Sequence, residues 1–117
     1  MKACDVVNPG DTVIVYPGVY FENIKVKRAG TADKPITFDK SDSAAWGYLN
    51  VFAPGSISLA YATLTGGGGD DSNSYGALEA RGDQLAPAQA VLKVQHVTVA
   101  NSASYGVSLR AGGAFTA

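Results

Sequence analysis

Two Pro-Gly turns, each followed at once by a short β-prone run, constrain the fold of this chain more than any other feature. Proline fixes φ and glycine accepts positive φ, so Pro9-Gly10 and Pro17-Gly18 each predict a tight turn. Residues 12–15 and 21–27 follow these turns, and apolar and polar side chains alternate in the second run, as in a half-buried strand. A third break at residues 30–35 precedes another β-prone run.

The order of these turns and strands is itself informative. From Pro9 to Phe38 the chain reads PGDT, strand, PGVYFE, strand, GTADKPI, strand. This string resembles the opening coil of right-handed parallel β-helix proteins of the pectate-lyase-like superfamily. The resemblance implies an all-β chain folded as a short right-handed parallel β-helix, which is a solenoid. It matches structural turns and no catalytic group, and a fold alone does not assign a function.

The rest of the chain has no sustained helical period and consists of short β-prone runs separated by turns. Runs at such spacing are also typical of sandwiches and barrels, so spacing alone leaves the architecture open. The runs span residues 12–15, 21–27, 36–38, 48–52, 57–65, 91–99 and 106–110.

An internal repeat favours the solenoid. Residues 59–66 (LAYATLTG) are similar to residues 94–101 (VQHVTVAN), 35 positions later. Ser-Tyr-Gly recurs at an offset of 30, with Tyr75 in the first copy and Tyr105 in the second. A copied strand pattern with a corner of variable length is typical of a solenoid. Two unrelated strands of similar composition remain the alternative.

The longer corner of the first copy is Gly-rich. Residues 66–73 (GGGGDDSN) stand where the second copy has only residues 100–103. Four glycines lower the cost of disorder, so we expect a flexible, solvated loop that is dispensable for folding. The alternative is a calcium site that uses the carboxylates of Asp70 and Asp71.

Alternation with polar residues predicts which side chains fill the interior. After Gly76 the two copies slip by one residue, and strict alignment would bury Glu79. Because an unpaired buried carboxylate costs several kcal/mol, we expect Leu78 and Ala80 to point inward instead. The predicted core is Val13, Val15, Ile24, Val26, Ile36, Phe38, Leu59, Leu64, Val97, Val99, Val107 and Leu109.

The size of the chain predicts one domain, residues 1–117, of about four coils at roughly 22 to 35 residues each. Residues 3–7 leave room for no more than the last turn of the helix that usually caps the family's first coil, and residues 111–117 end within a coil. We therefore expect a domain that lacks this cap helix and the family's later coils. Exposed coil ends present unpaired strand edges and apolar surface. We therefore expect a homo-oligomer that assembles through the solenoid ends.

Composition excludes several classes of function. The net charge is −1, without the basic field that nucleic acids require, and no apolar run reaches the roughly 18 residues of a membrane span. One cysteine and one histidine, Cys4 and His96, exclude an internal disulfide and a zinc site, so we expect no metal and no cofactor. No secretory signal is visible at Met1, which indicates a cytoplasmic chain, whereas the family resemblance implies secretion or surface display.

The family resemblance implies polysaccharide as the substrate class. Its lyases use a basic Arg or Lys and its hydrolases use paired Asp residues, but no such motif can be matched here, so no catalytic residue is assigned. We expect a non-catalytic module that self-assembles and binds carbohydrate. The alternative is a fragment or minimal member of a lyase or glycoside hydrolase acting on acidic polysaccharide.

Candidate carbohydrate contacts follow from residue type. Aromatic faces bind the apolar C–H surface of sugars, and Trp46, Tyr75, Tyr105 and Arg81 are the predicted ligand-binding residues. A ladder of stacked tyrosines that only stabilises the solenoid is the alternative for the two tyrosines. His96 is expected to face solvent without a catalytic role. An enzyme should gather Asp, Glu, Lys or Arg on one face, whereas a binding module should fill that face with Ser, Thr, Ala and Tyr.

Overall fold

The chain folds almost entirely into strands. The computed structural model describes residues 3–21, 24–25, 28–41, 45–69, 77–82, 89–103, 105–110 and 113–116. These ranges contain one four-residue helix, α1 (Ala3–Val6), and ten strands. The strands are β1 (Thr12–Val15), β2 (Tyr20–Phe21), β3 (Ile24–Lys25), β4 (Ile36–Lys40), β5 (Leu49–Phe52), β6 (Ser56–Thr65), β7 (Leu78–Arg81), β8 (Val91–Ala100), β9 (Val107–Arg110) and β10 (Ala114–Thr116).

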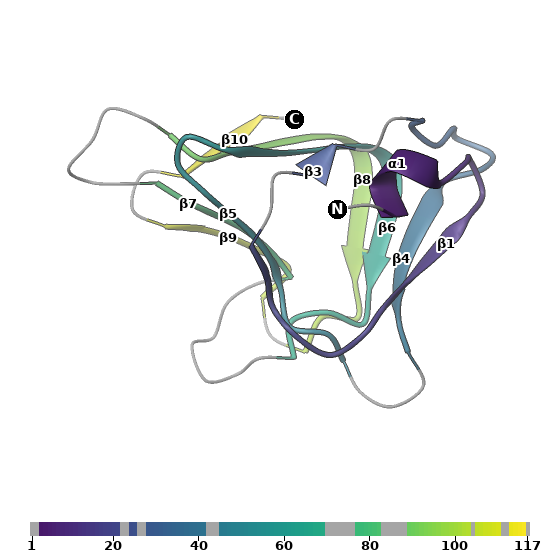
Figure 1. The fold of residues 1–117 in the computed structure, drawn as a ribbon, viewed down its shortest axis with the longest axis horizontal. Coiled ribbons are helices and arrows are strands. Elements are labelled where there is room, and N and C mark those ends of the chain that lie inside the picture. Colours follow the sequence, from purple (N-terminus) through teal and green to yellow (C-terminus); the bar gives the residue numbers. More distant parts are fainter. Residues whose placement is uncertain are drawn as a thin grey trace.

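All strand pairs described are parallel and build two sheets (Figure 1). The four-stranded sheet has the order β2-β5-β7-β9, and the six-stranded sheet has the order β1-β4-β6-β8-β10, with β3 paired to β6. The expectation of an all-β chain is therefore confirmed, and its strands are parallel. Parallel strands cannot be joined by tight hairpins, so the chain leaves one sheet and returns to it later, beside the earlier strand.

The registers of the two sheets show how the sequence repeat is used. In the six-stranded sheet, Leu59 of β6 pairs with Val94 of β8, which is the offset of 35 expected from the repeat. In the four-stranded sheet, Leu49 pairs with Leu78 and Leu78 pairs with Val107, an offset of 29 at each step. The Ser-Tyr-Gly segments repeat at an offset of 30, whereas the paired strands that follow them repeat at an offset of 29. The expected slip of one residue after Gly76 is therefore confirmed.

A bend divides each of the two longest strands. Tyr61 in β6 and His96 in β8 have positive φ values of 49° and 52°. The part of β6 before Tyr61 pairs with β3, and the part after it pairs with β4. Strands therefore lie beside their successors in three columns. The first column holds β1, β4 and the second halves of β6 and β8, and the second holds β2, β5, β7 and β9. The third column holds β3, the first halves of β6 and β8, and β10.

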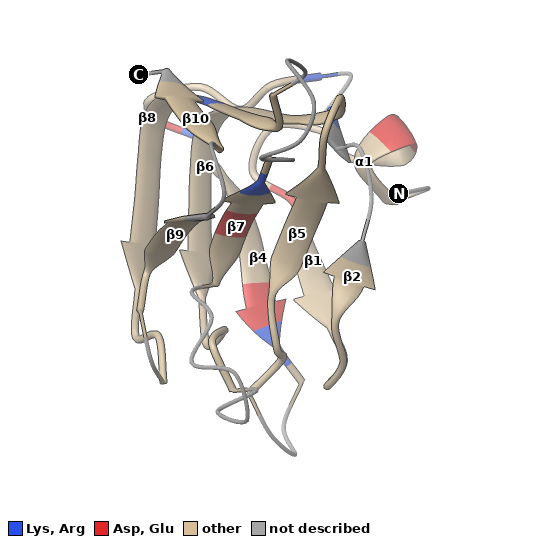
Figure 2. Cartoon of the chain, turned by 90° about the vertical axis from the view of Figure 1, so that its left-hand side faces the viewer, with Lys and Arg blue, Asp and Glu red and all other residues tan. Residues whose placement is uncertain are grey.

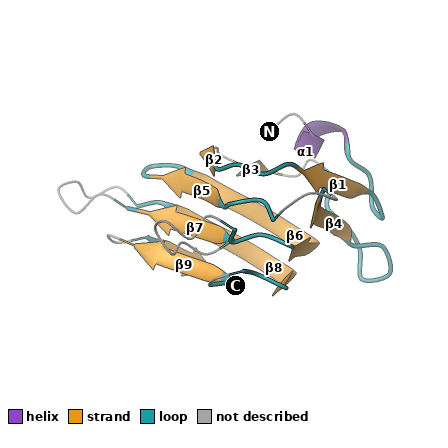
Figure 3. Ribbon diagram, turned by 90° about the horizontal axis from the view of Figure 1, so that it is seen from below, coloured by secondary structure: helices purple, strands orange, loops and turns teal. Residues whose placement is uncertain are grey.

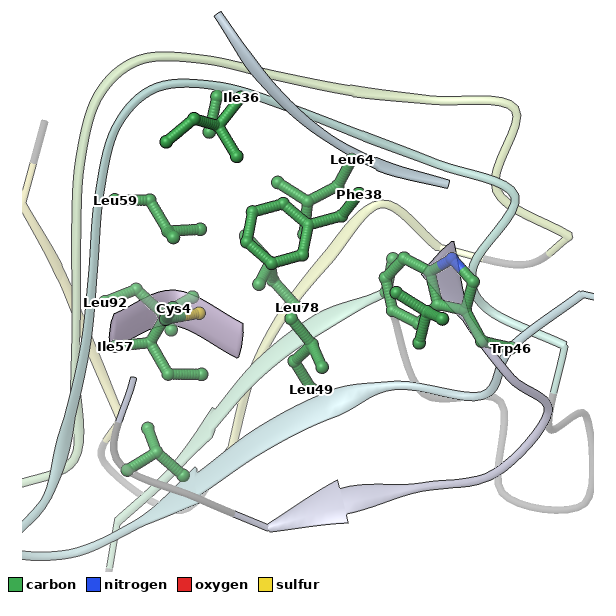
Figure 4. Packing of buried hydrophobic residues seen from close by; sticks show 14 of the residues in the cluster. Cys4, Ile36, Phe38, Trp46, Leu49, Ile57, Leu59, Leu64, Leu78 and Leu92 are labelled. Atoms are coloured by element: carbon green, nitrogen blue, oxygen red, sulfur yellow. The ribbon is translucent and has the colours of Figure 1, made fainter. Parts of the chain in front are cut away.

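The hydrophobic core lies between the two sheets (Figure 4). Leu49 and Leu78 of the four-stranded sheet lie close to Phe38 and Leu64 of the other sheet, and all four are fully buried. Of the predicted core, Val15, Ile36, Phe38, Leu59 and Leu64 are buried, while Val13, Val97 and Val99 are partly buried and pack against the cluster. Leu78 and Ala80 point inward as expected. Val26 and the side chain of Ile24 lie outside the described residues.

Two members of the predicted core are not buried. Val107 is 41% exposed and Leu109 is 45% exposed. Both belong to β9, which pairs with β7 and is the last strand of its sheet in the described ranges. The alternation of β9 correctly predicts that both side chains face inward. Burial also requires a neighbouring strand on the side of β9 away from β7, and β9 has none there among the described residues. The prediction that these two side chains are interior is therefore wrong.

The two ends of the strand stack differ (Figure 3). At one end α1 lies near β3, and Cys4 and Val7 are buried in the core cluster. The expected helical turn at residues 3–7 is thus confirmed as Ala3–Val6. At the other end lies β9, the edge strand of the four-stranded sheet. Strand β10 is the corresponding edge strand of the six-stranded sheet. Within the described ranges, no helix is long and apolar enough to cross a membrane.

Candidate functional site

Trp46 does not belong to a surface site. Its side chain is fully buried, and its indole N–H donates a hydrogen bond to the Thr65 carbonyl at 3.0 Å. A buried ring has no face to offer a sugar, so the predicted carbohydrate contact at Trp46 is not compatible with this structure. The tryptophan is instead a core residue whose single polar atom is satisfied, as is usual for buried indoles.

The glycines that surround Trp46 are packed rather than solvated. Gly66, Gly67 and Gly68 are buried, and a Cβ added at Gly67 would lie 2.6 Å from the Trp46 ring. Backbone hydrogen bonds join the same segments, from Trp46 N to Gly66 O at 3.1 Å and from Gly69 N to Trp46 O at 2.9 Å. The expectation of a solvated loop is therefore wrong for residues 66–68, and at Gly67 the missing side chain makes room for the indole. Residues 70–73, with Asp70 and Asp71, lie outside the described residues.

The backbones of Arg81 and Tyr105, two of the other predicted sugar contacts, lie well apart. Tyr105 is 64% exposed and lies beside the start of β7, where the Ala77 N–H donates to the Tyr105 carbonyl at 3.0 Å. Arg81 is the last residue of β7 and lies four residues after Ala77, a distance of about 13 Å at 3.3 Å per residue. Tyr75 lies outside the described residues. The backbones of Arg81 and Tyr105 therefore lie at opposite ends of β7.

Arg81 lies on an aromatic ring at the end of the four-stranded sheet. Its guanidinium carbon is 5.9 Å from the centre of the Phe52 ring, within the range of a cation–π contact. Phe52 is 47% exposed, and the two residues are partners in the β5–β7 register. The pair forms a small surface of mixed aromatic and cationic character.

Glu79 lies two residues before Arg81 and is fully buried (Figure 2). Its neighbour across the register is Asn50, which is 1% exposed and donates a hydrogen bond from Nδ2 to Oε2 of Glu79 at 3.3 Å. Because Leu78 and Ala80 take the inward positions, we expected the carboxyl group to escape burial. That expectation is wrong: the carboxylate is buried, and an amide on the neighbouring strand accompanies it.

The bend in the long strands forms a more complete site. The rings of Tyr61 and His96 stack with centroids 4.6 Å apart and an interplanar angle of 16°. Positive φ is uncommon outside glycine and is an outlier for a bulky residue such as tyrosine. Residues in strained backbone conformations persist where the surrounding structure holds them, often at functional sites. The stack therefore marks the bend as a candidate site.

A shallow pocket of about 280 Å³ opens beside this stack. One wall is the turn before β4, where reciprocal backbone hydrogen bonds join Thr31 and Lys34 at 3.0 and 3.1 Å. A Cβ added at Gly30 would lie 2.4 Å from the Tyr61 carbonyl oxygen, so this turn packs directly on the bend. We call this space the bend pocket; it is lined by Thr31, Ala32, Pro35, Tyr61, Ala62, Thr63, His96 and Thr98.

Two of the lining threonines belong to a column that crosses the six-stranded sheet. Thr12 pairs with Thr37, Thr37 with Thr63, and Thr63 with Thr98. Thr37, Thr63 and Thr98 each alternate with inward-facing apolar residues, as Thr37 does with buried Ile36 and Phe38. The column therefore lies on the outer face of the sheet. Hydroxyl and methyl groups therefore repeat along this face at the strand spacing of about 4.8 Å.

Sequence reasoning placed His96 at the surface, and the residue is exposed. It did not identify the bend pocket. The offset of 35 already aligned Tyr61 with His96, so the repeat contained the signal for their proximity. The left-handed backbone that brings the rings together had little signal, because tyrosine rarely adopts it and histidine, although enriched there, adopts it in few of its occurrences.

Comparisons with protein-family models, with curated proteins and with solved structures find no significant match to this chain. Among the residues that the structure describes, no group of His, Cys, Asp and Glu side chains is arranged to hold a metal ion.

Proposed function

We propose that this chain is a short right-handed parallel β-helix module of about four coils that binds carbohydrate without catalysing a reaction on it. Support for the fold comes from the three columns of parallel strands, in which each strand lies beside its successor from the next passage of the chain. A constant offset of 29 residues across the four-stranded sheet is the regularity expected of stacked coils.

The bend pocket is the observation that carries the proposed binding function. Aromatic rings offer apolar faces to the C–H surface of sugars, and threonine hydroxyls can donate to and accept from sugar hydroxyls. Its volume of about 280 Å³ lies just below the usual range of about 300–1,000 Å³ for ligand pockets. A single sugar ring of a longer chain fits a pocket of this size better than a whole oligosaccharide does.

The lining favours a neutral sugar. None of its eight residues is Lys, Arg, Asp or Glu. A uronate or sulfated sugar would lose hydration of its charge without meeting a cation, which is unfavourable. Three threonines, two alanines, a proline, a tyrosine and a histidine make up the lining, which supports a binding module.

Binding is tested by titrating labelled protein with neutral cello-, xylo- and manno-oligosaccharides and with oligogalacturonate, followed by amide chemical shifts and calorimetry. We expect a neutral series to shift the amides of Tyr61, Thr63 and Thr98. Removing the ring in His96→Asn should weaken that binding about tenfold, the equivalent of one aromatic contact of about 1.4 kcal/mol. Absence of binding to every neutral series would contradict the proposal.

A matched pair of variants separates the pocket from the rest of the threonine column. Thr98→Val removes a hydroxyl that lines the pocket, and Thr12→Val removes one in the same column on β1, outside the pocket. Loss of one hydrogen bond of about 1 kcal/mol predicts roughly fivefold weaker binding for Thr98→Val alone. Equal affinities of the two variants would place the sugar elsewhere.

One observation favours an enzyme acting on acidic polysaccharide as the second candidate function. Arg81 and Glu79 are two residues apart on β7, so they share a face of the four-stranded sheet, and Arg81 lies over Phe52. Assays with pectate, alginate and chondroitin, with and without calcium, follow unsaturated products and reducing ends. We expect no turnover. Turnover that disappears in Arg81→Ala or Lys93→Ala would replace the proposed binding module with this enzyme.

A further inference from the structure

Exposed apolar side chains gather on the edge strands at one end of the molecule. Val107 and Leu109 on β9 are 41% and 45% exposed, and Phe115 on β10 is 45% exposed. At the opposite end Ile14 on β1 is 51% exposed, but the inward-facing side chains of that strand are covered: Val15 is buried and Val13 is partly buried against the core. An open strand edge next to apolar surface is a template for pairing with another chain. Inward-facing side chains are therefore more exposed at the β9 end than at the β1 end.

The backbone of β9 shows which groups are available at its open edge. The Leu78 N–H donates to the Gly106 carbonyl at 3.0 Å, and Leu78 is paired with Val107. In a parallel ladder, the backbone groups of alternate residues point to the same neighbour. The groups of Ser108 therefore point to β7 as those of Gly106 do, and the N–H and C=O groups of Val107 and Leu109 point to the open edge.

We propose that this edge binds a second copy of the chain, with β9 antiparallel to the β9 strand of the second copy and a two-fold axis at Ser108. In this register Val107 lies opposite Leu109 of the other copy, and their backbone groups, which meet no strand among the described residues, form hydrogen-bonded pairs in both directions. Ser108 faces Ser108, and Gly106 faces Arg110.

The sequence of β9 suits this pairing because the strand is its own complement. Residues directly opposite in an antiparallel pair share a face, so inward-facing Val107 meets inward-facing Leu109. A shift of the axis by half a residue would place Ser108 opposite Leu109 and mix the two faces, which a buried face does not permit. A two-fold pair uses the same edge of both copies, so it closes and does not extend into a filament.

Cysteine cross-linking tests the position of the axis. Ser108 lies in a non-hydrogen-bonded pair, where Cα atoms are about 4.5 Å apart, within the range of about 4.4–6.8 Å for disulfides. Ser108→Cys should therefore form a covalent dimer on mild oxidation. Thr12→Cys, on the edge strand β1, is the matched control, and the wild type shows the background from Cys4, which is 1% exposed. No more dimer in Ser108→Cys than in Thr12→Cys would overturn the proposed axis.

Sedimentation at micromolar to submillimolar concentration tests the interface without a disulfide. We expect a species of about twice the 12.0 kDa chain mass. Leu109→Lys should return it to 12.0 kDa, whereas Ile14→Lys, at a residue 51% exposed on β1, should not. A wild-type monomer, or equal behaviour of the two variants, would overturn the interface. The proposed interface depends only on strand pairing and exposure at β9. A monomeric protein would therefore leave the outcome of the carbohydrate titrations unchanged.

Discussion

Tyr61 and His96 stack at a centroid distance of 4.6 Å while both keep a left-handed backbone, 35 residues apart in the chain. The backbone conformation costs roughly 1–2 kcal/mol at each residue, and an aromatic pair returns about 0.5–1.5 kcal/mol. The stack therefore does not offset the strain of both residues by itself. Packing of the neighbouring strands must supply the remainder, since Ala62 and Leu64, which follow Tyr61, are buried.

Two substitutions at His96 separate the backbone strain from the stacking energy. His96→Asn and His96→Ala both remove the ring, but asparagine tolerates positive φ better than alanine does. We expect the free energy of unfolding of His96→Asn to exceed that of His96→Ala by about 1 kcal/mol, measured by urea denaturation. Equal stabilities would show that the left-handed conformation is not strained at this position.

The packing of the glycines around Trp46 predicts a strong effect of a single methyl group. Gly67→Ala places a Cβ 2.6 Å from the buried indole, and overpacking of this kind costs about 1–3 kcal/mol. Gly106→Ala is the control, because its Cβ would meet Val99 at an ordinary 3.5 Å. Thermal unfolding should separate the two variants clearly. A neutral Gly67→Ala would mean that this segment adjusts freely.

Equivalent leucines in the core and at the edge should differ in stability effect. Leu92 is fully buried, so Leu92→Ala should cost about 2–5 kcal/mol through lost burial and a cavity. Leu109 is 45% exposed, so Leu109→Ala should cost under about 1 kcal/mol in dilute protein. If β9 forms the proposed interface, the cost at Leu109 will grow with protein concentration. Urea denaturation at two concentrations measures both effects, and a large, concentration-independent cost at Leu109 would contradict them.

Strand positions and the register of the repeat were predictable because both follow from local alternation and turns. The expected runs at residues 12–15 and 57–65 became β1 and β6, and the offset of 35 became the register of Leu59 with Val94. Strand β7 was not expected as a strand, because Leu-Glu-Ala-Arg has no β-prone residue. It forms because β5 and β9 supply hydrogen bonds on both sides.

The candidate site was less predictable, because exposure depends on segments far away in the sequence. Tryptophan is a residue type that often binds sugars, yet the glycines after β6 enclose Trp46. The bend pocket combines the turn at Thr31 with His96, residues that lie 65 positions apart. Residue type predicted carbohydrate chemistry, but only the packing of three passages of the chain locates the pocket.

The buried pair of Asn50 and Glu79 allows a test of how this fold accommodates a carboxylate in its interior. Asn50 donates to Oε2 of Glu79 at 3.3 Å, and hydrogen bonds to charged groups contribute about 1.5–3 kcal/mol. Asn50→Leu should therefore destabilise the protein by about 2–3 kcal/mol, because a buried carboxylate loses this donor. Glu79→Gln keeps an acceptor for Asn50, so it should destabilise the protein less than Asn50→Leu does.

A double-mutant cycle decides whether the two residues act together. When both members of a buried polar pair become apolar, the change can be nearly neutral, so Asn50→Leu should cost much less in a Glu79→Leu background. We expect a coupling energy of at least about 1 kcal/mol from denaturation of the four proteins, within the range found for residues in contact. Additive effects would mean that Glu79 is stabilised by its other surroundings, and that the carboxylate does not depend on the strand beside it.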